Sequence, residues 1–211
     1  LAVVAMTTKT RAQDMLSTPL TLEAITAGTI SMNNPSSSTL SIEYSKDGTT
    51  WTTVNTSPAI TIDVDAGDVV RLRGNNDQYG NTPDDHNITS TAEVYVYGNI
   101  MSLVHATDFA TNFRLTNSFA FKNLFCAGYS NDTDWELITN TTIKSHPTKD
   151  LLLPSPYVPC SCYADMFAGC EALERAPELP ATEMDDWWYD EVTYDYSDGS
   201  IDCYMEMFKG C

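Results

Sequence analysis

Basic residues are scarce in this chain of 211 residues, in which 11 Lys and Arg stand against 29 Asp and Glu, for a formal net charge of −18. A surface this acidic repels nucleic acid, so we expect no nucleic-acid partner. No apolar run approaches the roughly 18–20 residues of a membrane-spanning helix, and we therefore expect no membrane insertion. Cations, basic proteins and neutral glycans remain compatible partners.

Catalytic signatures are also missing. The three His residues are scattered, and there is no nucleophile elbow, phosphate-binding loop, HExxH motif or obvious pair of catalytic carboxylates. The cysteines do not have zinc-ligand spacing with a His nearby. We therefore predict a protein that is not an enzyme, with no catalytic residues, no metal site and no cofactor.

The chain contains a short sequence motif, called the phrase below, that is repeated along the chain. Residues 162–170 read CYADMFAGC and residues 203–211 read CYMEMFKGC, with six of nine positions identical. A weaker copy, FKNLFCAG, occupies residues 121–128. The copies start about 41–42 residues apart, and a fixed period of this size indicates stacked units that cannot bury their apolar faces alone.

The first half of the sequence predicts an antiparallel β-sandwich over residues 19–103. Several apolar segments alternate with polar positions, and turn chemistry such as Asp47-Gly48 joins them. Residues 75–90 have no periodicity and predict a long surface loop. The predicted strands are Leu20–Thr26, Thr29–Asn33, Leu40–Tyr44, Thr50–Val54, Ala59–Val64, Val69–Arg73 and Ala92–Tyr97.

The second half, residues 104–211, predicts a short solenoid that ends in mid-repeat. Strand signals weaken there while Cys, Met and aromatic residues increase. We expect Tyr163–Phe167 to form a short helical or 3₁₀ turn that Gly169 ends, because Gly tolerates a positive φ. The predicted fold class is thus mainly β: a sandwich followed by a solenoid with short helical or 3₁₀ turns.

All six cysteines lie in this second half, at positions 126, 160, 162, 170, 203 and 211. An even number of cysteines in an exported protein would suggest disulfides. However, Cys162 and Cys203 hold equivalent positions in the repeat, as do Cys170 and Cys211, so stacking would place them in ladders of small buried side chains. We favour buried thiols at these four positions.

The composite phrase CYxxMFxGCxxLxxAPELPAT, read from residue 162, resembles the leucine-rich repeat of BspA-like surface proteins of anaerobic gut and oral bacteria. PLTLEAITAGTI at 19–30 and DAGDVVRLRGN at 65–75 look like the β-domain that precedes such repeats. The resemblance implies a leucine-rich-repeat solenoid and an exported, secreted or cell-surface protein. Residues 1–18, which begin LAVVAM, fit either the remnant of an export leader or an ordinary terminus.

The connection between the second and third copies carries an insertion at residues 183–202, which holds eight acidic residues, five aromatic residues and no Lys or Arg. It could be a hairpin that covers the solenoid, or a surface that binds a partner. In the second case the contact residues would be Trp187, Trp188, Tyr189, Tyr194 and Tyr196.

Together these features predict a non-enzymatic binding or adhesion module that recognises a host or environmental protein or glycan. Two alternatives come from other classes of protein. One is a structural spacer or phage tail-associated component, and the other is an accessory region of a carbohydrate-active enzyme. The sequence does not indicate the oligomeric state.

Overall fold

The computed structural model describes residues 14–32, 40–55, 59–76, 87–130, 136–184 and 203–211. The chain is mainly β with several sheets, as expected, and none of the sheets in the described ranges is closed. The elements are β1 (Leu20–Ala24), β2 (Gly28–Met32), β3 (Ser41–Ser45), β4 (Thr52–Asn55), β5 (Ile60–Val64), β6 (Val69–Gly74), β7 (Ile88–Ser90), β8 (Val94–Asn99), the 3₁₀ helix η1 (Ile100–Leu103), β9 (Tyr129–Ser130), β10 (Glu136–Leu137), β11 (Ile143–Ser145), β12 (Leu151–Leu152), β13 (Tyr157–Val158) and β14 (Glu183–Met184).

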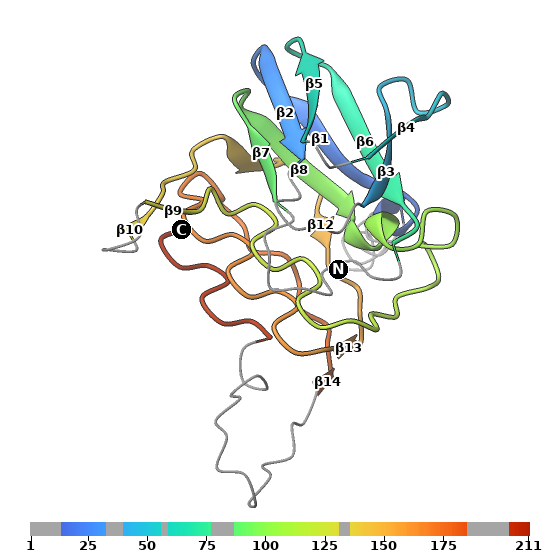
Figure 1. The fold of residues 1–211 in the computed structure, drawn as a ribbon, viewed down its shortest axis with the longest axis vertical. Coiled ribbons are helices and arrows are strands. Elements are labelled where there is room, and N and C mark those ends of the chain that lie inside the picture. The colour runs from blue at the N-terminus through green and yellow to red at the C-terminus, as the bar shows by residue number, and fades with distance from the viewer. Residues whose placement is uncertain (1–13, 33–39, 56–58, 77–86, 131–135, 185–202) are drawn as a thin grey trace, which may run out of the picture.

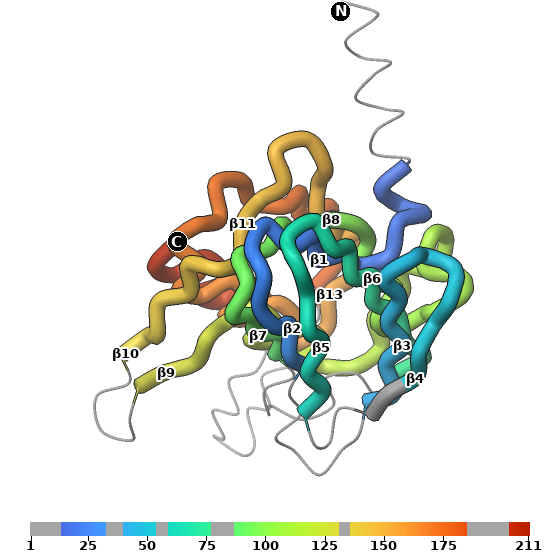
Figure 2. Tube along the Cα trace, turned by 90° about the horizontal axis from the view of Figure 1, so that it is seen from above, coloured from blue at the N-terminus to red at the C-terminus, as the bar shows by residue number. Residues whose placement is uncertain are grey.

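Two sheets make up most of the first half. The larger has the strand order β11-β8-β1-β6-β3-β4, with β12 also paired to β8, and the smaller has the order β5-β2-β7. All seven predicted strands are present, as β1–β6 and β8. The alternation that predicted them is visible in β6, where Val70 and Leu72 are fully buried while Arg71 and Arg73 are partly exposed on the other face. In Figure 2, β9 and β10 project from the side of the molecule opposite β3 and β4.

The loop predicted over residues 75–90 is wrong at its end, because Ile88–Ser90 forms β7. This strand pairs antiparallel with β2 in the register Met32↔Ile88. A three-residue strand is too short to show periodicity, so packing forms it: Ile88 is fully buried in the core. Residues 77–86 of the predicted loop lie outside the described residues.

The two halves share one sheet and one core. Strand β8 from the first half pairs in parallel with β11 and β12 from the second, in the registers Val94↔Ile143 and Gly98↔Leu151. The buried hydrophobic cluster also runs through both halves, from Leu22 to Phe167. A domain boundary at residues 103–104 would therefore cut through continuous packing. The division of the chain into two domains stays a prediction.

The three copies of the phrase stack directly on one another. We call them coil 1 (residues 117–128), coil 2 (159–170) and coil 3 (203–211), and Figure 1 shows them as neighbouring rows that run from yellow-green through orange to red. Two columns of rings cross the stack. Phe121, Tyr163 and Tyr204 form one, with centroids 6.0 and 5.6 Å apart. Phe125, Phe167 and Phe208 form the other, with centroids 5.4 and 5.6 Å apart.

The backbone of coil 2 is a succession of turns, so the prediction of a short helical or 3₁₀ turn over Tyr163–Phe167 is wrong. The N–H groups of residues 162, 164, 166, 168 and 170 each bond to the carbonyl three residues earlier. The intervening N–H groups, at residues 163, 165, 167 and 169, instead donate to carbonyls of coil 3 at 2.8–3.0 Å. This alternation needs left-handed residues, which are Ser161, Asp165 and, as expected, Gly169 with φ of +77°.

Gly169 is required by space as well as by backbone conformation. A Cβ at this position would lie 2.5 Å from the Ile138 carbonyl oxygen, closer than two such atoms can approach. The left-handed conformation of Gly169 recurs at Gly210 in coil 3, and that of Asp165 recurs at Asn123 in coil 1 and Glu206 in coil 3. The repeated sequence thus encodes a repeated backbone path.

The cysteines form thiol ladders along the stack. All six lie in described residues and are present as thiols, and five are buried. The Sγ atoms of Cys162 and Cys203 donate to the carbonyls of Asn117 and Pro159, each at 3.3 Å, in the preceding coil. The Sγ of Cys170 donates in the same way to Phe125 O at 3.3 Å.

One cysteine differs from the prediction. Cys211 donates its thiol to Phe167 O at 3.1 Å, as its position in the repeat requires. It is nevertheless exposed, because coil 3 is the outermost described coil of the stack. The prediction of a buried thiol is therefore wrong at this position.

Candidate functional site

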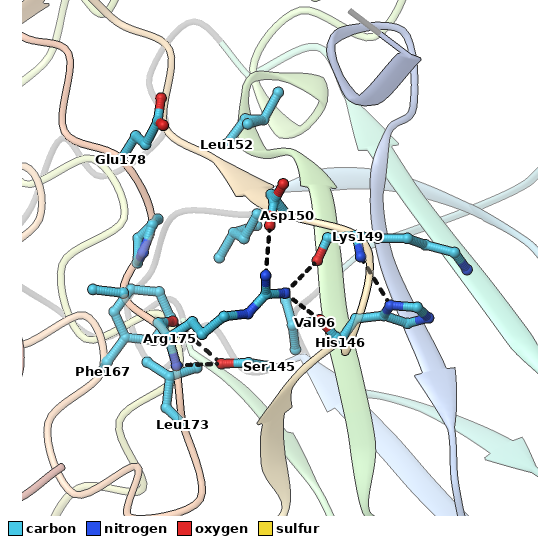
Figure 3. A pocket seen from close by; sticks show the side chains of 13 residues that line it. Val96, Ser145, His146, Lys149, Asp150, Leu152, Phe167, Leu173, Arg175 and Glu178 are labelled. Carbon is cyan, nitrogen blue, oxygen red and sulfur yellow. Dashed lines mark hydrogen bonds and ion pairs between the residues drawn. The ribbon is translucent and has the colours of Figure 1, made fainter. Parts of the chain in front are cut away.

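The candidate site is a pocket of about 290 Å³ at the junction of the sheet and the coils. Its lining comes from β8, β11, the loop of residues 146–150, β12 and the segment 173–178 that follows coil 2. Figure 3 shows Arg175 reaching across it toward the loop. The pocket exists because β11 and β12 join the same edge of β8, and the loop between them bulges away from it.

Arg175 holds the two sides of the pocket together. Its Nη1 lies 3.1 Å from Asp150 Oδ1, and its Nη2 donates to the backbone carbonyls of His146 and, at 3.1 Å, Lys149. Its backbone N–H donates to Ser145 Oγ at 2.9 Å, and Ser145 Oγ donates back to the Arg175 carbonyl at 3.2 Å. A planar guanidinium suits this role, because it offers several donors in fixed directions.

His146 stabilises the loop whose backbone carbonyls accept hydrogen bonds from Arg175. Its Nδ1 accepts the backbone N–H groups of Thr148 and Lys149, each at 3.0 Å, which places the ring proton of the neutral imidazole on Nε2. The ring packs edge-on against Tyr95 and Tyr97, with centroids 5.2 and 5.1 Å away. Its Nε2 lies 3.8 Å from Glu23 Oε2.

Glu23 on β1 is the centre of a charge cluster beside the pocket. Its Oε2 lies 2.8 Å from Lys149 Nζ and accepts the Tyr97 hydroxyl at 3.1 Å. The hydrogen bond from Lys149 is the main reason that the pKa of Glu23 is lowered. Lys149 Nζ also sits 4.0 Å from the centre of the Tyr97 ring, and burial raises the pKa of that phenol. The cluster therefore ties the loop to the sheet through ionised partners.

This arrangement suits holding and binding better than proton transfer. Ser145 and His146 are neighbours in sequence, but the hydroxyl is engaged by the Arg175 backbone and the imidazole Nδ1 by loop N–H groups. A nucleophile–base relay needs these two side chains to meet each other. The apolar floor, which includes Phe167 and Leu173, could instead cover an apolar part of a small ligand.

The predicted binding residues cannot be placed against this pocket. Trp187, Trp188, Tyr189, Tyr194 and Tyr196 lie outside the described residues, as do residues 1–13 of the predicted N-terminal segment. The flanking residues are described: Met184 at the end of β14 is 56% exposed, and Cys203 at the start of coil 3 is buried. The binding assignment stays a prediction.

Sequence reasoning missed the pocket and its arginine. Arg175 is a lone basic residue between Glu174 and Glu178 in the segment that follows the phrase. This positive charge between two negative ones is the sequence feature that could have indicated a role for Arg175. The partners of Arg175 are mostly backbone carbonyls, which carry no residue identity that a sequence could reveal.

The described residues also bear on metal binding and on membrane insertion. Among them no group of three or more His, Cys, Asp or Glu side chains is placed to hold a metal ion. In the same ranges no helix has the length and apolar character needed to cross a membrane.

Comparison of the chain with models of known protein families, with curated proteins and with solved structures finds no significant match.

Proposed function

We propose that this chain is a non-enzymatic binding or adhesion module of an exported bacterial surface protein, and that it recognises a protein or glycan ligand. In this proposal the first half is an antiparallel β-sandwich and the second is a BspA-like leucine-rich-repeat solenoid. The resemblance of the repeated phrase and of the preceding segments supports both statements.

The observation that carries the proposal is the stacking of three copies of the phrase on a sheet-anchored scaffold. Backbone hydrogen bonds join coil 1 to coil 2 and coil 2 to coil 3, and strand β8 joins the coils to the first half. Stacked repeats of this kind present extended surfaces whose shape is fixed before a ligand arrives. Preorganisation lowers the entropic cost of binding, which suits a recognition module.

The insertion at residues 183–202 is the proposed contact. It begins in β14, which pairs with β13 and ends at the exposed Met184, and it leads to Cys203, the buried first residue of coil 3. Trp187, Trp188 and Tyr189 supply the anchors, with Tyr194 and Tyr196 beside them. Aromatic rings stack well on sugars and on protein partners, and the acidic neighbours favour a cationic or hydroxyl-rich ligand.

The test is a binding screen of the purified protein on glycan arrays and on extracellular-matrix proteins. We expect the double variant W187A/W188A to lose binding while its melting temperature stays near that of the parent. Trp51→Ala is the matched control, because Trp51 lies beneath Arg73 in the first half, with the guanidinium 3.9 Å from the ring centre. Loss of binding in the control alone, or turnover of a glycan by the protein, would contradict the proposal.

A spacer role is the second candidate, and the shared core of the two halves favours it. A continuous sheet and core make the unit stiff, which a spacer between other domains requires. Failure to bind any arrayed ligand, together with a single cooperative unfolding transition, would favour the spacer over the binding module.

A further inference from the structure

The pocket of the candidate site is a gap between two chain segments that meet at both of its ends. At one end Ser145 Oγ accepts the Arg175 backbone N–H at 2.9 Å, and at the other Leu152 forms a β-bridge with Glu178. Pro177 lies between these contacts and has no N–H with which to close the gap. The cavity of about 290 Å³ is therefore set by the fold, and every residue that lines it lies within the described ranges.

The floor of this pocket is apolar. Val96, Leu151 and Phe167 are buried there, and Leu173 is half-buried beside them. The volume is close to the lower limit of roughly 300 Å³ for small-molecule sites. Because an apolar group gains free energy when such side chains remove it from water, the floor fits the compact apolar body of a small ligand.

Most of the polar groups around the pocket already have partners. The Ser145 hydroxyl exchanges hydrogen bonds with the Arg175 backbone. The Arg175 guanidinium donates to two loop carbonyls and pairs with Asp150 at 3.1 Å. The Lys149 ammonium lies 2.8 Å from Glu23 Oε2, so it is held at the sheet and not at the pocket. A ligand therefore meets few polar groups that are still available.

Two carboxylates remain at the rim, those of Asp150 and Glu178, and they lie on opposite sides of the pocket (Figure 3). The Asp150 side chain is 45% exposed and shares its charge with Arg175. Glu178 is exposed, and among the described residues it has no basic side chain at ion-pair distance. An ammonium group between the two carboxylates would be attracted by both. An anion would be repelled by both, and it would find the Arg175 guanidinium already engaged.

We infer that this pocket is a binding site for a small organic amine with a compact apolar body. The body lies on the floor that Val96, Phe167 and Leu173 help to form, and the ammonium group donates to Asp150 and Glu178. The net charge of −18 adds a long-range attraction for such a cation. None of the pocket residues belongs to the contact proposed at residues 183–202, so the inference does not depend on that proposal.

Three probes that differ in charge and in apolar body test the inference. Phenethylamine carries an ammonium group and a ring, hydrocinnamate carries the ring with a carboxylate, and ethylamine carries the ammonium group alone. Each is titrated to about 10 mM into the isotope-labelled protein while NMR follows the backbone amide shifts. We expect phenethylamine to give saturable shifts within residues 145–152 and 173–178, with a Kd of about 1 mM. The other two probes should bind at least about tenfold more weakly.

Three matched substitutions locate the ammonium group. Asp150→Asn and Glu178→Gln each remove one rim carboxylate, and we expect each to weaken phenethylamine binding by about threefold, as the loss of one exposed ion pair does. Glu174→Gln removes the same charge from an exposed residue of the same segment that does not line the pocket, so it should leave binding unchanged. Thermal unfolding of each variant verifies that the fold is retained.

Several results would overturn the inference. They are equal binding of hydrocinnamate and phenethylamine, the absence of saturable shifts at the pocket amides, and an effect of Glu174→Gln as large as that of Glu178→Gln. The W187A/W188A protein should bind phenethylamine as the parent does, which separates the pocket from the contact proposed at residues 183–202. Loss of amine binding in that variant would also overturn the inference.

Discussion

The Phe167 ring lies parallel to the Phe208 ring one coil further along the chain, with centroids 5.6 Å apart and planes 2° from parallel. On its other face Phe167 stacks on Phe125 at 5.4 Å and 14°. The sequence repeats because each layer must offer its neighbours the same ring at the same place. Each copy of the phrase therefore supplies one layer with the rings that its neighbours pack against.

Replacing the central ring should cost far more stability than replacing the outer one. Phe167 is fully buried, so we expect Phe167→Ala to lower the free energy of unfolding by about 3–5 kcal/mol. Phe208 is half-buried with one stacked neighbour, and Phe208→Ala should cost less than half as much. Urea unfolding of the two variants measures the difference. Equal losses would contradict the layered packing.

Native-state alkylation should distinguish one cysteine from the other five. Burial raises the pKa of the Cys170 thiol, and a protonated, buried thiol does not react. Partial burial raises the pKa of the Cys211 thiol as well, so its exposure sets it apart. We expect iodoacetamide at about pH 8.5 to modify Cys211 first and the rest only after unfolding. Mass spectrometry gives the count. Two or three disulfides in the untreated protein would contradict the thiol ladders.

Two substitutions separate the parts that Arg175 plays at the pocket. Asp150→Asn removes only the partly exposed ion pair, so we expect a loss of at most about 1 kcal/mol. Arg175→Met also removes the hydrogen bonds to the carbonyls of His146 and Lys149, and it should cost about 1–2 kcal/mol more. Thermal unfolding compares the two. A loss of equal size in both variants would mean that the ion pair alone holds the loop.

The buried carboxyl of Asp165 should make stability depend on pH in a defined direction. Burial raises its pKa, although the Tyr129 hydroxyl, which donates to Oδ1 at 3.1 Å, acts against this. Because the folded pKa exceeds the unfolded one, stability is greatest below the unfolded value and is lost as the pH rises through the folded value. The structurally equivalent residue in coil 1 is Asn123, which shares the left-handed backbone.

We therefore expect Asp165→Asn to stabilise the protein at neutral pH. The gain should shrink as the pH falls below about 4, where the unfolded Asp is also protonated. Chemical denaturation at several pH values measures it. As a control, Glu206→Gln changes an exposed position of the same column and should have a smaller effect. A gain for Asp165→Asn that grows toward acid pH would contradict the assigned direction.

Local patterns were enough to predict all strands of the first half except β7, and the positive φ of Gly169. Apolar and polar residues alternate where one face of a strand is buried, and this pattern predicted β1–β6 and β8. The positive φ of Gly169 follows from the residue type, because glycine tolerates this conformation. The prediction of thiols at Cys162, Cys170 and Cys203 also rests on repeat equivalence, and the structure agrees with it.

Features that depend on tertiary packing could not be predicted from these local patterns. The strand β7 forms because Ile88 is buried and paired with β2. In coil 2 the N–H groups alternate between bonds within the coil and bonds to coil 3, a pattern that appears only when the coils stack. The pocket depends on the parallel pairing of β8 with β11 and β12, which are distant in sequence. The exposure of Cys211 follows from its layer, a property of the whole stack.

The most direct test of the stacked arrangement is a nuclear Overhauser measurement between ring protons of Phe167 and Phe208 in protein labelled at phenylalanine. We expect cross-peaks between these two rings and between Phe125 and Phe167, and none between Phe125 and Phe208, which lie two layers apart. Assignment follows from the single Phe-to-Leu variants. Absence of the Phe167–Phe208 cross-peak in the folded protein would contradict the stacking of the repeated phrase.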